Sequence, residues 1–169
     1  MQVVADTSAL VSLGTVADAN PSPLDRLLDQ HTVLLPEQVS TELEETASYD
    51  DTAGEAAVAV LARRESFDVR AVDLDESFPL DDGENAAVTL ANDVDATRLL
   101  CDEFNRLALV HASLTSTRLV TTPTLLAGFV SSGELSAGSA SALLAAISEA
   151  RSWSGNSYVE RAEESMAPE

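Results

Sequence analysis

The chain has 169 residues, 45% of them hydrophobic, a length that suits one domain with a sizeable core. Its nine basic residues are all arginine, and its 29 acidic residues give 9 − 29 = −20, which excludes a broad basic patch that would hold nucleic acid by counterion release. We expect no membrane-spanning helix, because no run of eighteen apolar residues occurs, and no signal peptide, because no basic flank precedes the apolar start. A single cysteine, Cys101, excludes an internal disulfide framework and suits a reducing cytoplasm.

Apolar runs alternate with helical patterns along the chain. The runs predict strands over residues 2–6, 31–35, 67–74, 97–101 and 118–121. Helices are predicted from residue 8, from a Ser22-Pro23 cap, and over 36–47, 51–65, 81–92, 103–112, 123–131, 139–151 and about 158–164. Strands separated by helices indicate a three-layer α/β/α fold with a parallel sheet. We expect one domain over residues 1–169, with the helices from about residue 123 packed on it.

The common phosphate-binding and nucleophile motifs are missing. The sequence has no G-x-x-x-x-G-K-[ST], no G-x-G-x-x-G and no G-x-S-x-G. The absence of lysine removes Schiff-base chemistry, and His31 and His111 lack the spacing of a zinc site, so we expect structural or surface roles for both. Cys101 is expected to be a small core residue. Carboxylates therefore carry the remaining candidate chemistry.

Four acidic residues stand where a parallel sheet would build a site. Asp6 ends the first predicted strand and Asp102 follows the fourth, while Glu42 and Glu84 lie on helices that follow or precede strands. If the strand order is 3-2-1-4-5, the order reverses between strands one and four, and ligands bind at such a crevice. Four carboxylates in one cleft would repel one another unless cations lay between them. Oxygen ligands favour Mg²⁺ or Mn²⁺, which suit phosphodiester hydrolysis.

Each acid also has a local, structural interpretation. Asp6 and Asp102 could cap the helices that follow them. Asp81 and Glu84 fit a capping box, and Glu42 could be one of several exposed acids on its helix. We expect capping after the first strand to fall to Thr7 or Ser8, which leaves Asp6 free to face the crevice.

The roles within the cleft stay open at this level. Glu84 could orient a water molecule or bind metal, and Glu103, beside Asp102, could be a further ligand. Arg106 and Arg118 are the candidates for phosphate contact, because a chain this acidic must rely on local arginines.

The motifs VVADTSAL, VLLPEQVSTEL, LDDGENAAVTLA, RLLCDEF and RLVTTPTLLAGFVSSGELS occur in this order over most of the chain. In this order and spacing they resemble the PIN-domain nucleases, in particular an archaeal and bacterial branch with a D-x-G-E-x-x-A-x-x-L-A signature. The resemblance places Asp6, Glu42, Glu84 and Asp102 in the four acidic positions of the family. The chain departs from that branch where TTPT replaces a glycine-containing turn, and where Phe104 and Asn105 precede Arg106 in place of basic residues.

The resemblance implies a PIN-like fold and a ribonuclease that uses Mg²⁺ or Mn²⁺. Many members of the family are toxins of type II toxin–antitoxin pairs, often homodimers that an antitoxin protein inhibits. The lysine-free, acidic composition resembles that of proteins from salt-loving archaea, because high salt screens self-repulsion of this kind.

Two other functions compete with the ribonuclease. One is a catalytically silent PIN-like interaction module that keeps its acids for capping and folding. The other is a metal-dependent phosphatase, which the missing lysine and the serine at position 8 disfavour. Near the C-terminus an apolar stripe is expected to pack in the core rather than form a dimer face, and its members are Ala140, Leu143, Leu144 and Ile147.

Overall fold

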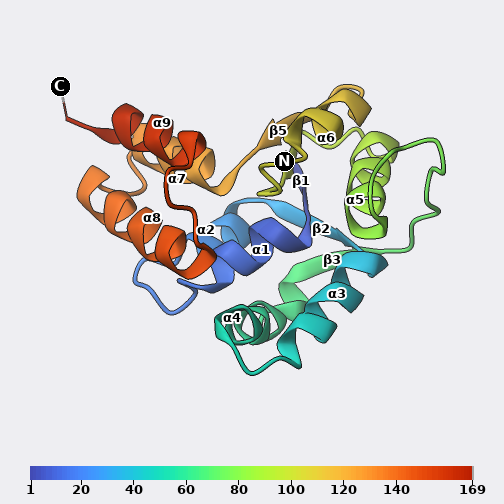
Figure 1. Ribbon diagram of the computed structural model, residues 1–169, viewed down its shortest axis with the longest axis horizontal. Helices are drawn as coiled ribbons and strands as arrows, with labels where there is room; N and C mark the ends of the chain where they lie inside the picture. Colours follow the sequence, from blue (N-terminus) through green and yellow to red (C-terminus); the bar gives the residue numbers. More distant parts are fainter. Residues whose placement is uncertain (169) are drawn as a thin grey trace.

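Five parallel strands form the centre of the molecule (Figure 1), in a computed structural model that describes residues 1–168. The sheet order is β3-β2-β1-β4-β5, as predicted from the sequence, so the order reverses between β1 and β4. The strands are β1 (Gln2–Ala5), β2 (Thr32–Pro36), β3 (Phe67–Arg70), β4 (Arg98–Leu100) and β5 (Arg118–Val120). This is a PIN-like α/β/α arrangement, with helices on both faces of the sheet.

Helices connect and cover the strands. They are α1 (Thr7–Gly14), α2 (Pro23–Gln30), α3 (Glu37–Ala47), α4 (Thr52–Leu61), α5 (Asp82–Asp93), α6 (Leu107–Ser113), α7 (Thr122–Ser131), α8 (Ala137–Arg151) and α9 (Ser157–Met166), with a short 3-10 helix at Arg64–Ser66. The predicted cap of α2 is confirmed, because the Ser22 hydroxyl accepts from the Asp25 amide at 3.2 Å and Pro23 is the first helical residue. Among the described residues, no helix combines the length and the apolar character needed to cross a membrane.

Successive side chains of each strand point to opposite faces of the sheet, so the core consists of two hydrophobic clusters, one on each face of the sheet. Val3 and Ala5 of β1 pack with α1 to α4 and with α7 to α9, whereas Val4 points to the other face and packs with α5 and α6. The central strands are therefore apolar on both sides. Polar groups can enter only where a strand ends, which is where the candidate site lies.

The helices α7, α8 and α9 pack together on one side of the molecule, away from α5 and α6 (Figure 1). Three members of the predicted apolar stripe of α8 are fully buried, namely Ala140, Leu144 and Ile147, and Leu143 packs against the same cluster. The expectation that this stripe belongs to the core is confirmed.

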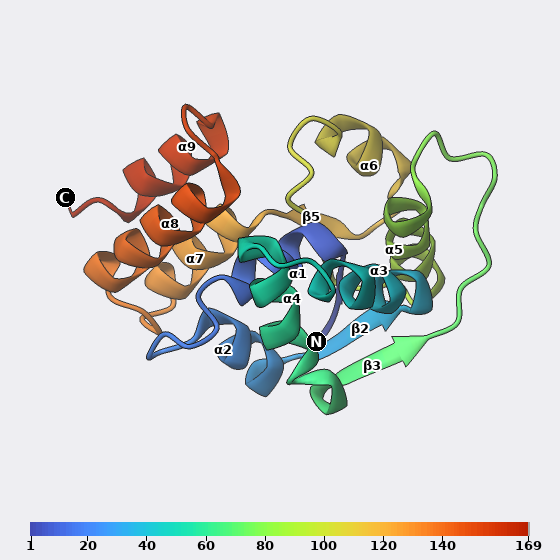
Figure 2. The same cartoon turned by 60° about the horizontal axis from the view of Figure 1, so that its bottom comes forward.

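Three predicted boundaries are wrong by four residues each. The third strand ends at Arg70 rather than at residue 74, and the chain continues as an irregular segment along the outside of α5 (Figure 2). The helix predicted over 51–65 ends at Leu61. The helix predicted from residue 103 begins at Leu107, because residues 102–106 form turns in which the Phe104 amide bonds the Asp102 carbonyl at 2.9 Å.

A glycine controls the packing of α1 against α4. A Cβ atom added to Gly14 would lie 2.4 Å from the backbone oxygen of Ala56. We expect Gly14→Ala to lower the free energy of unfolding by about 1–3 kcal/mol, because backbone cannot move aside as a flexible side chain can. Chemical denaturation measures the change.

Gly128, in the exposed middle of α7, supplies a matched control, because a Cβ there would meet nothing within 4 Å. Gly128→Ala should raise stability by about 0.5–1 kcal/mol through helix propensity. Equal effects of the two substitutions would contradict the proposed close contact of α1 with α4.

Candidate active site

The carboxyl ends of β1 and β4 bring two acids together. Ala5 pairs with Leu100 in these neighbouring parallel strands, so the chain leaves both strands at the same edge. Asp6 follows β1 directly and Asp102 lies two residues beyond β4. Their side chains are only 4% and 5% exposed. Two of the four predicted acids thus form a buried pair at the point where the strand order reverses.

Asp6 is held by local donors. Its Oδ1 accepts from the Ser8 hydroxyl at 2.6 Å and from the Ala9 amide at 3.1 Å, and its Oδ2 accepts from the Cys101 thiol at 3.2 Å. The bond from Ala9 makes Asp6 the N-cap of α1, so the expectation that Thr7 or Ser8 caps this helix is wrong. Asp6 has the extended backbone of a capping residue, while Thr7 and Ser8 are already helical.

Asp102 is held by the start of α7 rather than by the helix that follows it. Its Oδ1 accepts from the Thr122 amide at 2.7 Å and its Oδ2 from the Thr122 hydroxyl at 2.6 Å. The Asp102 amide in turn donates to the Ser8 hydroxyl at 2.9 Å. Ser8 therefore joins the two acids, and the first turn of α7 places its positive dipole end at Asp102.

The buried pair carries unfavourable charge. Burial raises the pKa of Asp6 from 3.8 to about 7, and the nearby charge of Asp102 adds to the rise against the opposing hydrogen bonds. Burial also raises the pKa of Asp102, with its hydrogen bonds from Thr122 acting in the opposite direction. Neither acid forms an ion pair within residues 1–168.

Glu42, on α3, lies over the same edge of the sheet. Its Oε2 accepts from the Thr7 hydroxyl, next to Asp6, and its carboxylate lies against Gly83, next to Glu84. A Cβ added to Gly83 would lie 2.3 Å from Glu42 Oε1. Burial raises the pKa of Glu42, and the negative charge of Asp81 adds to this rise.

Glu84 is buried in the first turn of α5 and is held by an arginine. The Asp81 carboxylate caps the helix by accepting from the Glu84 amide at 2.9 Å, as the capping-box pattern predicts for this half of the motif. The Glu84 carboxylate accepts from Arg106 Nε at 2.9 Å, and Arg106 also donates to the Pro79 carbonyl at 3.1 Å. Arg106, a predicted phosphate contact, is therefore engaged with an acid of the site.

A cavity of about 370 Å³ is lined by one of the four acids, Glu42, whereas Asp6, Glu84 and Asp102 do not line it. Glu42 lines it with Glu103, and Thr7 and Ser8 form part of its wall. Arg151, at the end of α8, is its basic residue. Its buried Nε has no hydrogen-bond partner among the described residues, and its charge lowers the pKa of Asp102. The sequence analysis missed Arg151, because nothing in the sequence shows that the end of this helix approaches Thr7 and Glu42.

Arg118, the second predicted phosphate contact, lies elsewhere. It begins β5, whereas Asp102 follows the carboxyl end of the neighbouring β4. Since the strands are parallel, Arg118 belongs to the opposite edge of the sheet from the acids. It is not a candidate for contact with a phosphate at this site.

The donor chemistry fits a divalent cation better than the positions of the donors do. Asp6 and Asp102 offer buried carboxylate oxygens without a cationic partner, which is the ligand type that Mg²⁺ and Mn²⁺ prefer. Glu42 and Glu84 are turned to Thr7 and Arg106. Across residues 1–168 no three acidic, histidine or cysteine side chains are grouped closely enough to hold an ion.

A family model described as a PIN domain matches residues 2–166, nearly the whole chain. No curated protein matches the sequence.

Because the Asp6 carboxylate is buried, we expect its replacement by asparagine to stabilise the fold by an amount that depends on pH. Because its folded-state pKa is raised, this group stabilises the fold most below about pH 4, and the contribution is lost as the pH rises through about 7. Asp6→Asn should therefore raise the stability of the metal-free protein by up to about 4 kcal/mol at about pH 8. At about pH 5 the gain should fall to about 1–2 kcal/mol, because folded Asp6 is then protonated while the unfolded chain is still mostly ionised at this residue. Below about pH 3 the gain should nearly vanish, because Asp6 is then protonated in both states. Thermal unfolding in molar KCl with a chelator measures the gain at each pH.

The exposed Asp50 gives the matched control, since Asp50→Asn removes the same charge from the surface. We expect little change at any of these pH values. A loss of stability in Asp6→Asn at about pH 8 would show that the ionised carboxylate supports the fold.

Proposed function

Because the chain belongs to the PIN-domain family, whose members are usually nucleases, we propose that it is a metal-dependent endoribonuclease that hydrolyses RNA phosphodiester bonds. The observation that carries the proposal is the buried pair of Asp6 and Asp102 at the reversal of the strand order. Burying two carboxylates without an ion pair costs folding free energy, so such a pair is found mainly where it serves a function.

In this proposal Asp6 and Asp102 hold Mg²⁺ or Mn²⁺, and Glu42 and Glu84 complete the set of ligands or catalytic groups. A bound divalent cation supplies activation of a water molecule and neutralisation of phosphate charge. The carboxylates of Asp6 and Asp102 are kept in place by hydrogen bonds from Ser8, Cys101 and Thr122. These three residues act as positioning residues.

The RNA would bind at the cavity that Glu42 and Arg151 line. Arg151 lines the cavity with Glu42, so its guanidinium can contact a phosphate next to the reacting one. Glu42 combines a place at the cavity with a pKa raised by burial, which suits it to accept a proton from water. Arg106 holds Glu84 and is available for phosphate if that ion pair opens.

The wider biological role is proposed on the family alone. Many PIN-domain proteins are toxins paired with an antitoxin and act as homodimers in the cytoplasm, and we propose the same for this chain. The size of the protein in solution, and a small antitoxin reading frame beside its gene, test these two points separately from catalysis.

A silent interaction module is the second candidate. It is favoured by the donors that already satisfy Asp6 and Asp102, and by the engagement of Glu84 with Arg106. This candidate predicts no response to metal. A measurement of metal binding, without any RNA substrate, therefore distinguishes the two candidate functions.

The decisive experiment measures cleavage of a structured RNA in molar KCl with millimolar Mn²⁺. Asp6→Asn and Asp102→Asn should each lower the rate at least about a hundredfold, because each removes a ligand and leaves the fold intact. Asp50→Asn should cleave as the wild type does. If the two site variants and the wild type degrade the RNA equally, the cleavage comes from a contaminant and the proposal fails.

Melting with and without Mn²⁺ separates the two candidates. The wild type should melt at a higher temperature with Mn²⁺, because an ion that binds only the folded state stabilises it. Asp6→Asn should show no rise. A wild type indifferent to Mn²⁺ would favour the interaction module.

The role of Arg151 is tested in the same cleavage assay. Arg151→Gln should lower kcat/KM about tenfold or more through a lost charge-assisted contact to RNA, with the Mn²⁺-dependent rise in melting temperature retained. Arg64→Gln is the control, since Arg64 pairs with Glu44 at 3.0 Å on the surface and does not line the cavity. Equal kcat/KM values for both variants would remove Arg151 from the RNA site.

A further inference from the structure

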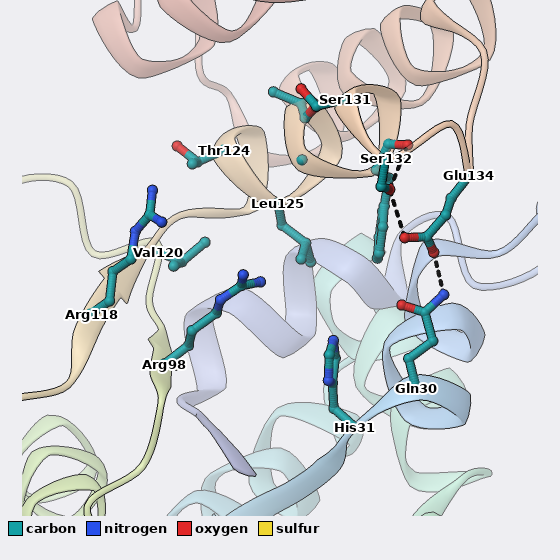
Figure 3. Close-up of a pocket in the computed structure, with 13 residues that line it drawn as sticks. Gln30, His31, Arg98, Arg118, Val120, Thr124, Leu125, Ser131, Ser132 and Glu134 are labelled. Carbon is teal, nitrogen blue, oxygen red and sulfur yellow. Dashed lines mark hydrogen bonds between the residues drawn. The ribbon is translucent and has the colours of Figure 1, made fainter. Parts of the chain in front are cut away.

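A second cavity lies at the opposite edge of the sheet from the acids. Its volume is about 420 Å³, within the range of small-molecule sites. Arg98 and Arg118, the first residues of β4 and β5, form one end of it, and α7 covers it (Figure 3). The nuclease proposal makes no use of this cavity.

The two arginines are placed side by side without a counterion. Arg98 and Arg118 are register partners in neighbouring parallel strands, so their side chains leave the same face of the sheet. Like charges directly opposite one another destabilise a sheet. Within residues 1–168 neither guanidinium forms an ion pair, although the chain carries 29 acidic residues. In Figure 3 the Arg98 guanidinium extends into the space beneath α7, and the Arg118 side chain rises beside the start of α7, on the side of Thr124.

His31 adds a third nitrogen group to the same cavity. Its ring points into the cavity between Arg98 and Gln30 (Figure 3), and its buried Nδ1 has no hydrogen-bond partner among the described residues. Burial lowers the pKa of His31, and the positive charge of Arg98 lowers it further. A negative ligand beside these groups would reverse the second effect and could accept from the unpartnered nitrogen.

The acid of the cavity is already compensated. Glu134 lies at the other end, where it accepts from the Gln30 side chain and from the Ser132 hydroxyl at 2.6 Å (Figure 3). Arg26 lies 3.9 Å from the same carboxylate. The negative charge of Glu134 therefore lies away from Arg98 and Arg118. Because it would repel an anion from its own end of the cavity, the arginine end is the place for an anion to bind.

We propose that Arg98, Arg118 and His31 form a binding site for a phosphoryl group, carried either by a small phosphorylated molecule or by an RNA backbone. Two guanidinium forks and an imidazole offer more donors than the two oxygens of one carboxylate can accept, whereas a phosphate presents three or four oxygens. The site lies at the edge of the sheet opposite Asp6 and Asp102, so it stands whether or not the chain is a nuclease.

Binding is tested by titration calorimetry with inorganic phosphate, pyrophosphate and a short RNA without terminal phosphates, at constant ionic strength. Arg98→Gln/Arg118→Gln should bind at least about tenfold more weakly than the wild type. Arg64→Gln/Arg70→Gln is the control, because it removes the same two charges from exposed residues outside the cavity. This comparison also cancels the general stabilisation of an acidic protein by salt.

The two histidines of the chain give a second readout. On addition of phosphate the imidazole resonances of His31 should shift, while those of His111, on α6, should stay in place. A response to phosphate or pyrophosphate identifies a small ligand, and a response to RNA alone identifies the backbone. Equal binding by the two double variants, or an equal response to acetate at the same concentration, would overturn the proposal.

Discussion

The Ser8 hydroxyl connects the two acids on which the rest of the candidate site depends. It donates to Asp6 and accepts from the Asp102 amide, and so fixes the end of β1 against the end of β4. Two buried carboxylates need donors on every side, and these come from the chain next to each acid or from the first turn of α7. The order of the strands brings Asp6 and Asp102 together, and the hydrogen bonds of this network lower the free-energy cost of burying their carboxylates.

The network links the C-terminal helices to the centre of the sheet. Thr122 supplies both donors to Asp102, and the helix that it begins packs against α8 and α9. Arg151, at the end of α8, lines the cavity with Glu42. The last three helices therefore complete the edge of the sheet as well as burying its face. Truncation before α7 would remove the partner of a buried charge.

The strands could be predicted from their apolar runs, and their observed order agrees with the PIN-like fold that the resemblance implies. The closeness of Asp6 and Asp102 could be predicted from their places after neighbouring strands, whereas the choice of Glu42 and Glu84 rested on the resemblance to the PIN-domain nucleases. Thr122 and Cys101 were missed as partners of the acids, because their roles depend on contacts between distant segments. The position of Arg118 could have been recognised, since a residue that begins a parallel strand lies opposite the strand's carboxyl end. The cap of α1 was misassigned because the local pattern offers three adjacent capping residues.

The ion pair between Glu84 and Arg106 limits how much uncompensated charge this edge must carry. Burial raises the pKa of Glu84, and the charge of Arg106 opposes that rise. Without Arg106 the buried carboxylate of Glu84 would also lack an ion pair. Arg106 is 39% exposed, so solvent screens the pair and it can open at small cost, more so in high salt. The acidic edge thus holds two buried carboxyl groups without an ion pair, Asp6 and Asp102, and a third, Glu84, that a neighbouring arginine can neutralise or release.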